Sequence, residues 1–383
     1  MPKKRPPAWR KFWRDWGLYL AILLVLAVTG VLITVLSRRT PEIATDRPYR
    51  LYFTQSDLGY PAPEGLEAEI LKDVDGATAF VDVATPRLDL PLLAQGLVRA
   101  RERGVTVRVL QNPPAAADSA VISVTNLLES HGVTVTLHPS GTLGGAFVVV
   151  DQKVVWAGSW DLSQEGLFQD AAYVLRWEIP RIAEDFHREF EEMVEQRAFG
   201  PASPKETAHR FIAILDVASM DVYMTPEDDP LADILQRMAA SRHEIVVMTE
   251  VLNDPRIEQR LIDQSPLSGT QVWGVVGRAQ NLTANLEKLL QIGVQIPPYR
   301  GSGEMRENAI LLDGRVTVIL SQRLVQERLD RYDGYVLVVV DDVLTQAIGR
   351  EFRRLFGLSV PTPAPPIEPT AGAVPTFTPT SRP

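Results

Sequence analysis

The sequence contains no cysteine among its 383 residues, which excludes disulfides, cysteine–zinc sites and cysteine nucleophiles. This absence leaves the compartment open, because a large domain can form a stable core without disulfides. Positive charge is also scarce, since 39 Lys and Arg face 48 Asp and Glu and the net charge is −9. With 45% hydrophobic residues, the chain has enough apolar side chains for one large core or two smaller ones.

Positive charge is densest at the N-terminus. Residues 1–16 hold six Lys or Arg and one Asp, so this segment carries +5 and the rest of the chain carries −14. Binding to phosphates depends on Lys and Arg, so such an acidic remainder is a poor general partner for nucleic acid or anionic lipid. We therefore expect no nucleic-acid partner.

One long hydrophobic run follows this basic segment. Residues 17–36 contain no charged side chain, and about twenty apolar residues in a helix span a bilayer. We predict a transmembrane helix at 17–37 that binds the cytoplasmic membrane. The excess of basic residues before it predicts a cytoplasmic N-terminus and an extracytoplasmic main domain. A cleaved signal peptide is the alternative, although no convincing small-residue cleavage site follows the run.

The rest of the chain divides into a linker, two halves that repeat each other, and a tail of distinct composition. Residues 38–49 read as a linker, and 50–200 and 201–358 as two similar halves. Residues 359–383 form a tail in which positions 361–383 hold eight Pro and five Thr. Such a composition cannot bury a core, so we predict a disordered tail.

Both halves alternate amphipathic helices with apolar strands. Strands predicted at 78–84 and 105–110 match those at 244–249 and 271–276. This order predicts an α/β fold of αβα layers, with mixed and mostly parallel sheets covered on both faces. In such units ligands bind at the carboxyl ends of the strands, so two halves facing each other would form a cleft at their interface.

The most informative stretch runs from Gly144 to Asp161, and a related one runs from Arg306 to Ser321. Each reads as a strand ending in Asp, a tight turn, and a second strand ending in Gly-Ser or Leu-Ser. With the order of elements in both halves, this pattern resembles the phospholipase D superfamily over roughly residues 48–357.

The resemblance implies a motif, HxKxxxxD, in each half, with both motifs lining one site. One His would attack phosphorus, the other would protonate the leaving group, and the lysines would hold the phosphate oxygens. Imidazole suits both roles near neutral pH, and fixed cations stabilise the charge at phosphorus. The implied chemistry needs no metal or other cofactor.

All four His and Lys positions of that motif are changed here. With Asp151 and Asp313 fixing the register, the His positions are Gly144 and Arg306, and the Lys positions are Ala146 and Asn308. Glycine and alanine offer neither a lone pair nor a proton, and arginine stays protonated. Asp161 and Asp170 also stand where the family usually has Asn, and they would repel phosphate. We therefore predict a pseudoenzyme without catalytic residues.

Three residues remain candidates for anion binding: Arg306, Ser159 and Ser321. The more conservative interpretation pairs Arg306 with an acid across the cleft, such as Asp161 or Glu304. Serines at such positions more often satisfy backbone groups of turns.

The remaining polar candidates favour structural roles. Asp151 and Asp313 each follow a strand and precede a tight turn, so we expect them to stabilise those turns. Among the five histidines, only His138 is expected near the cleft. None is paired with the spacing of a metal site.

These observations predict a membrane-anchored protein that binds or scaffolds at the cell envelope, with an envelope protein or a homologue as partner and with the oligomeric state left open. One alternative is a phosphodiesterase with altered or residual activity, in which a histidine such as His138 would act from outside the motifs. Another is an inactive subunit of a complex with an active homologue.

Overall fold

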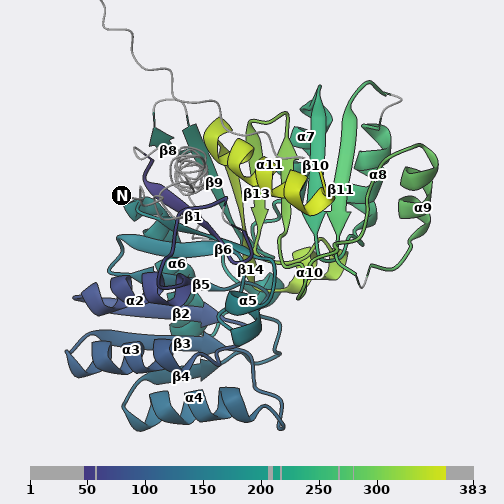
Figure 1. Cartoon of the computed structure of the whole chain (residues 1–383). Coiled ribbons are helices and arrows are strands. Elements are labelled where there is room, and N and C mark those ends of the chain that lie inside the picture. The colour runs from purple at the N-terminus through teal and green to yellow at the C-terminus, as the bar shows by residue number, and fades with distance from the viewer. Residues whose placement is uncertain are drawn as a thin grey trace, which may run out of the picture.

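The computed structural model describes residues 47–56, 58–205, 210–215, 218–265, 268–278 and 280–358. Its strands form two seven-stranded sheets, and Figure 1 shows the two halves side by side, purple to teal and green to yellow. The predicted transmembrane helix and the Pro/Thr-rich tail lie outside the described residues. Within those residues, no helix is both long and apolar enough to cross a bilayer.

The first sheet contains all the strands of the first half, in the order β1-β7-β6-β5-β2-β3-β4. Its strands are β1 Tyr49–Phe53, β2 Phe80–Thr85, β3 Thr106–Gln111, β4 Thr134–Leu137, β5 Phe147–Val150, β6 Val154–Ser159 and β7 Tyr173–Trp177. The helices are α2 Leu66–Gly76, α3 Pro91–Glu102, α4 Ser119–Ser130, α5 Gln164–Phe168 and α6 Pro180–Glu191, followed by a π-helical turn, Glu192–Gln196, and a 3-10 turn, Gly200–Ala202.

The second sheet repeats this arrangement in the order β11-β10-β12-β13-β14-β9-β8. Its strands are β8 Ile212–Leu215, β9 Ala218–Thr225, β10 Glu244–Thr249, β11 Gln271–Val276, β12 Ala309–Leu312, β13 Val316–Leu320 and β14 Gly334–Val340. The helices are α7 Leu231–Ala240, α8 Pro255–Asp263, α9 Ala284–Gln291, α10 Gln326–Arg331 and α11 Asp342–Phe356.

The sheets are mixed as predicted, but the expectation that they are mostly parallel is wrong. In the first sheet β2 pairs parallel with β3, and β3 with β4. In the second, β10 pairs parallel with β11. The other pairings are antiparallel. The tight turns after Asp151 and Asp313 each join two neighbouring strands, and strands joined in this way must run antiparallel.

Two long helices lie between the sheets because each carries an apolar stripe. In α6 the buried residues include Ile182, Phe186 and Phe190, which recur at helical spacing. Helix α11 begins where the carboxylate of Asp341 accepts bonds from the backbone N–H groups of Val343 and Leu344, and it ends at Gly357 in the left-handed conformation.

The core has three parts. Helices α2, α3 and α4 cover one face of the first sheet with an apolar cluster of their own. Helices α7, α8 and α9 cover the matching face of the second sheet. The inner faces of both sheets, α6 and α11 share the largest cluster. Since this cluster draws on both halves, packing holds their facing edges, and the cleft between them, in a fixed relation.

Candidate functional site

A cavity of about 270 Å³ lies between the two halves. It is lined by loops that follow strands of both sheets and by the segments that precede β5 and β12. Of the residues predicted for the site, it gathers Gly144, Arg306, Asn308 and Ser321. It also brings in Asp161 from the first half. The two changed motifs therefore meet at one place, as the resemblance implied.

The halves meet there with approximate two-fold symmetry. The backbone N–H of Gly144 donates to the carbonyl of Asp333 at 2.7 Å, and that of Arg306 donates to the carbonyl of Ala171 at 2.7 Å. The two residues at the Lys positions of the motif, Ala146 and Asn308, are linked across the halves in a similar way. Tyr335 donates its hydroxyl to the carbonyl of Ala146 at 2.7 Å, and Tyr173 to that of Asn308 at 2.8 Å. Each half thus fixes the backbone of the other half's motif.

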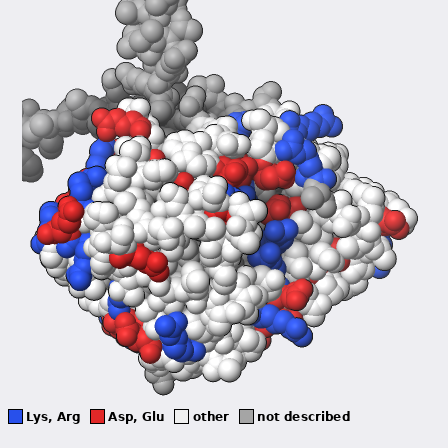
Figure 2. Space-filling model, turned by 90° about the horizontal axis from the view of Figure 1, so that it is seen from below, with Lys and Arg blue, Asp and Glu red and all other residues white. Residues whose placement is uncertain are grey.

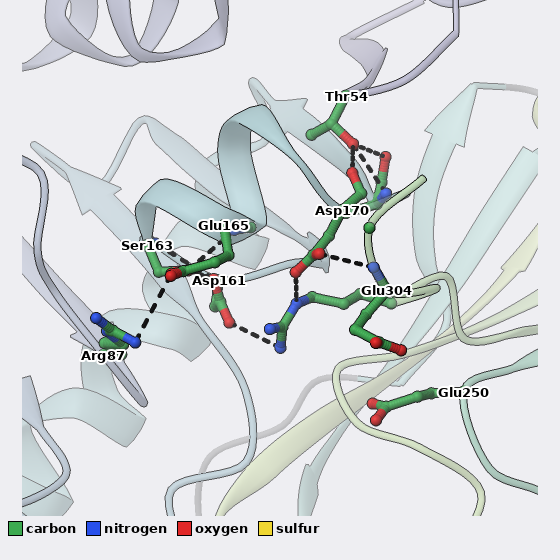
Figure 3. A network of polar contacts seen from close by, with 12 residues as sticks. Thr54, Arg87, Asp161, Ser163, Glu165, Asp170, Glu250 and Glu304 are labelled. Carbon is green, nitrogen blue, oxygen red and sulfur yellow. Dashed lines mark hydrogen bonds and ion pairs between the residues drawn. The ribbon is translucent and has the colours of Figure 1, made fainter. Parts of the chain in front are cut away.

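Arg306 is held between two carboxylates of the first half. Its Nη1 lies 3.0 Å from Oδ2 of Asp161, and its Nε forms an ion pair with Asp170. Figure 3 shows Asp161 and Asp170 approaching one guanidinium from two sides. Burial acts to lower the pKa of Arg306, but both carboxylates outweigh it and raise the pKa. The arginine is therefore a neutralised cation and a crosslink between the halves.

Glu304, the other acid considered for Arg306, has a different partner. Its backbone N–H donates to Oδ1 of Asp170 at 2.8 Å, and its side chain lies 3.7 Å from Nη2 of Arg278. Asp170 thus receives both the guanidinium and a backbone donor, which compensates its burial.

Ser159 and Asn308 form a closed hydrogen-bond network. The hydroxyl of Ser159 donates to the carbonyl of Arg306 and accepts from the backbone and side-chain amide groups of Asn308, both at 2.9 Å. The side-chain oxygen of Asn308 accepts from Thr249 and from the backbone N–H of Glu250. Both residues are buried. Their polar atoms stabilise the junction of the halves, and neither side chain offers an unused donor to a ligand.

On the other side of the cleft, Gln322 occupies the place where a side chain at position 144 would begin. A Cβ added to Gly144 would collide with the side-chain oxygen of Gln322. Gln322 is only 4% exposed, and its amide nitrogen donates to the carbonyl of Arg328 at 3.0 Å. Because that carbonyl can only accept, the orientation of the amide is fixed. The neighbouring Ser321 accepts from the backbone N–H of Tyr335.

Two further arginines, which the sequence analysis did not single out, line the cavity. Arg323 forms an ion pair with Glu250 at 3.2 Å. Arg328 projects from α10, and its guanidinium carbon lies 4.3 Å from the centre of the Tyr332 ring. Burial, with Arg323 nearby, lowers the pKa of Arg328. Because Arg323 follows Ser321 by two residues, as Asp161 follows Ser159, comparison of the repeats could have found it.

Asp151 and Asp313 lie at the far ends of β5 and β12, away from the cavity. The carboxylate of Asp151 accepts from the backbone N–H groups of residues 78, 79 and 80, at 2.7 to 3.0 Å. Asp313 binds those of residues 242, 243 and 244 in the same manner. For both carboxylates burial opposes ionisation, but the backbone donors outweigh it and lower the pKa. Each Asp fastens its turn to the start of the neighbouring strand.

His138 lies behind the cleft and does not line the cavity. It is fully buried, and its Nε2 bonds to Oδ2 of Asp333 at 2.8 Å. The backbone N–H groups of Ser140 and Thr142 point to Nδ1 at 3.4 and 3.3 Å, so Nδ1 accepts and Nε2 carries the proton. The backbone N–H of Gly200 donates to the other oxygen of Asp333. His138 is thus a crosslink between the halves and is not among the residues that line the cavity with Arg306.

The face of the molecule that Figure 2 shows carries both signs of charge. Viewed along the direction of Figure 2, acidic and basic side chains lie beside one another near the middle of the face, without a uniform basic patch. Among the residues that the structure describes, no group of three or more His, Asp or Glu is placed to hold a metal ion.

Comparisons with known proteins identify the first half independently. Residues 70–194 match the family model described as "Cardiolipin synthase, PLD-like domain". No curated protein matches the sequence.

Solved structures share the fold over most of the chain. Phosphatidylserine synthase from Haemophilus influenzae matches with a TM-score of 0.61 and 12% identity, over 84% of this chain and 90% of its own. Polyphosphate kinase from Porphyromonas gingivalis matches with a TM-score of 0.60 and 10% identity, over 80% of this chain. The matched region spans 50% of that kinase. At such identities the structural matches show a common fold.

The family match covers elements from α2 to α6, and the two-sheet fold extends the likeness across both halves. These findings show a PLD-like domain over residues 70–194. Together with the meeting of the two motif segments at one cavity, they support an assignment of the chain to the phospholipase D superfamily.

Proposed function

We propose that this protein is a non-catalytic phospholipase D-like domain that acts by binding in its interdomain cleft. One observation carries the proposal: the two positions at which the family has its nucleophile and its general acid hold residues with structural contacts. Gly144 is covered by Gln322, and Arg306 is neutralised by Asp161 and Asp170. Removing both members of a nucleophile–acid pair leaves only background catalysis.

The contacts of the remaining motif residues support the same proposal. The side chains of Ser159 and Asn308 form hydrogen bonds with each other, and Ser159 also bonds to the backbone of the opposite half. His138, the histidine that could have replaced the lost nucleophile, is fully buried against Asp333. A general acid or nucleophile must reach its substrate within hydrogen-bond distance, and His138 does not line the cavity.

The proposal includes an extracytoplasmic location, with residues 17–37 as a membrane anchor. The charge pattern of the N-terminal segment supports it. The first strand among the described residues is β1, Tyr49–Phe53, so the predicted linker 38–49 would keep the two halves close to the membrane. The full chain should sediment with membranes, and a chain lacking residues 1–37 should not. Release of the full chain by salt alone would contradict the anchor.

The catalytic part of the proposal is tested with the full chain in detergent, offered phospholipids and a chromogenic phosphodiester. No turnover above that of buffer is expected. Arg328→Gln, inside the cleft, and Arg331→Gln, exposed on the same helix, provide matched variants. Turnover that Arg328→Gln abolishes and Arg331→Gln preserves would overturn the proposal, because it would place an active site in this cleft.

A further inference from the structure

The two sides of the cleft differ in how their charges are balanced. On one side Arg306 is enclosed by Asp161 and Asp170. Ser159 stands opposite Tyr173 in the first sheet, and Ser321 bonds to Tyr335 in the second. Asp161 lies two residues after Ser159, and Arg323 lies two residues after Ser321, so these two positions are equivalent. In the same way Asp170, three residues before Tyr173, is equivalent to Tyr332, three residues before Tyr335. The Gly144 side therefore has a cation and an aromatic ring where the Arg306 side has two acids.

Of the two arginines on the Gly144 side, only Arg323 has a counter-ion. It pairs with Glu250 at 3.2 Å. Arg328 stacks on Tyr332, and it makes no ion pair or side-chain hydrogen bond with any residue that the structure describes. Its side chain is half-buried and lines the cavity. A guanidinium in that position gives up hydration without gaining an acceptor. It therefore offers five donors in a fixed fork to a bound molecule.

We propose that Arg328 binds the carboxylate group of a small molecule in this cavity. The inference rests on the proposed function, because a non-catalytic cleft must retain its ligand unchanged. A planar carboxylate matches the guanidinium fork with two parallel hydrogen bonds. The stacked Tyr332 ring holds the guanidinium plane in place for that contact.

Charge favours a monoanion over a phosphate dianion. The cavity is also lined by Arg306 and Arg323, but these are paired with Asp161, Asp170 and Glu250. Arg328 is therefore the cavity arginine without an ion pair among the described residues. A ligand with one negative charge pairs with Arg328, whereas a second negative charge would find no unpaired cation in this lining. The cavity volume of about 270 Å³ is below the usual range for drug-sized ligands. The ligand is therefore a carboxylic acid of a few carbons, or the carboxylate end of a slim molecule.

Calorimetric titration of the full chain at neutral pH and low salt tests this inference. The probes are acetate and lactate, with acetamide as the uncharged analogue of acetate and inorganic phosphate as the competing anion. Acetate and lactate are expected to bind, and at least tenfold more tightly than acetamide or phosphate. Arg328→Gln should weaken carboxylate binding at least tenfold, whereas Arg331→Gln should leave it unchanged.

A second measurement separates a binding role from a structural one. If Arg328 serves a ligand, Arg328→Gln should unfold at the same temperature as the parent chain or higher, because an unpaired half-buried charge is removed. A clear fall in that temperature would mean that the arginine stabilises the fold, and would overturn the inference. Equal binding of acetamide, preferred binding of phosphate, or no binding by any probe would overturn it too. None of those results would bear on the predicted lack of turnover, so the proposed function and this inference can fail separately.

Discussion

At the scale of single residues, Arg306 links the two halves. It stands at a His position of the motif, yet its guanidinium joins the halves through two acids of the opposite half. Arg306→Gln should destabilise the fold by about 2 kcal/mol, because Asp170 stays buried without its cation. Chemical denaturation measures the loss. Asp170→Asn on that background should recover part of it, and additive effects in this double-mutant cycle would refute the coupling.

A second residue-scale feature is a group of buried carboxyls between the halves. Glu227 is 3% exposed. Burial, with Asp228, Asp333 and Glu192 nearby, raises the pKa of Glu227 from 4.5 to about 8. Burial also raises the pKa of Glu189, which faces the same group. In the unfolded chain Glu227 loses its proton near pH 4.5, whereas in the folded chain it keeps the proton until about pH 8. The stability that protonated Glu227 provides is thus complete below pH 4.5 and is lost as pH rises to 8.

The free energy of unfolding should therefore fall between pH 6 and pH 8.5. Glu227→Gln should reduce this fall and stabilise the chain by roughly 1–3 kcal/mol at pH 8.5, since each pKa unit corresponds to about 1.4 kcal/mol. Denaturant titrations at the two pH values provide the measurement. Glu287→Gln, in the first turn of helix α9, serves as a control outside the cluster. Parallel pH profiles for the parent chain and Glu227→Gln would show that Glu227 does not titrate in this range.

Sequence reasoning reached some of these residues and missed others for a physical reason. The ion pair between Arg306 and Asp161 was foreseeable because register fixed both positions in the resemblance. The second partner, Asp170, and the cover that Gln322 provides over Gly144 depend on how the halves face each other. No local pattern encodes that relation. His138 was expected near the cleft, but its contact with Asp333 also depends on how the two halves pack against each other.

At the scale of elements, the two Asp turns determine how each sheet is assembled. Asp151 and Asp313 have φ of 52°, and their carboxylates bind three successive backbone N–H groups where β2 and β10 begin. These bonds join the end of β5 to β2 and the end of β12 to β10. This role was predictable, because a strand followed by Asp and a tight turn is a local signal.

Asp151→Ala should cost about 1–3 kcal/mol, because backbone donors that the carboxylate satisfies lose their acceptor. Alanine also tolerates the left-handed backbone less well than Asp. Asp151→Asn retains one acceptor oxygen and should cost less. In both variants the loss should shrink as pH falls through the lowered pKa of Asp151, since that stabilisation exists only while the carboxylate is ionised. Thermal unfolding at neutral and acid pH measures this, and an equal loss at both pH values would contradict the assignment.

The element order was predicted well, while the strand directions were not. Strands predicted at 244–249 and 271–276 match β10 and β11 residue for residue. The alternation of helices and strands suggested parallel pairing, but short connections through the Asp turns and the small helices α5 and α10 return the chain to neighbouring antiparallel strands. Connection length, more than element type, sets strand direction.

At the scale of the whole molecule, the halves share one core. The cluster between the sheets includes Phe147 and Phe186 of the first half and Tyr335 of the second. The ring centres of Phe186 and Tyr335 lie 4.9 Å apart, and those of Phe147 and Phe186 lie 5.0 Å apart. Aromatic contacts of this kind add to the free energy of burial, so the interface resembles the interior of a single domain.

Neither half should therefore fold alone. A chain of residues 47–205 would expose the α6 face and the inner face of the first sheet, including Phe186 and Trp177, to water. The hydroxyl of Tyr173 would also lose its acceptor at Asn308. We expect each separate half to lack a cooperative unfolding transition by circular dichroism, and the two halves expressed together to recover one. A cooperative transition in an isolated half would show that the duplication consists of two independent domains. In that case contacts at the edge of the cleft would hold Gly144 and Arg306 at their distance from each other. The shared core between the two sheets would then not be needed for the geometry of the cleft.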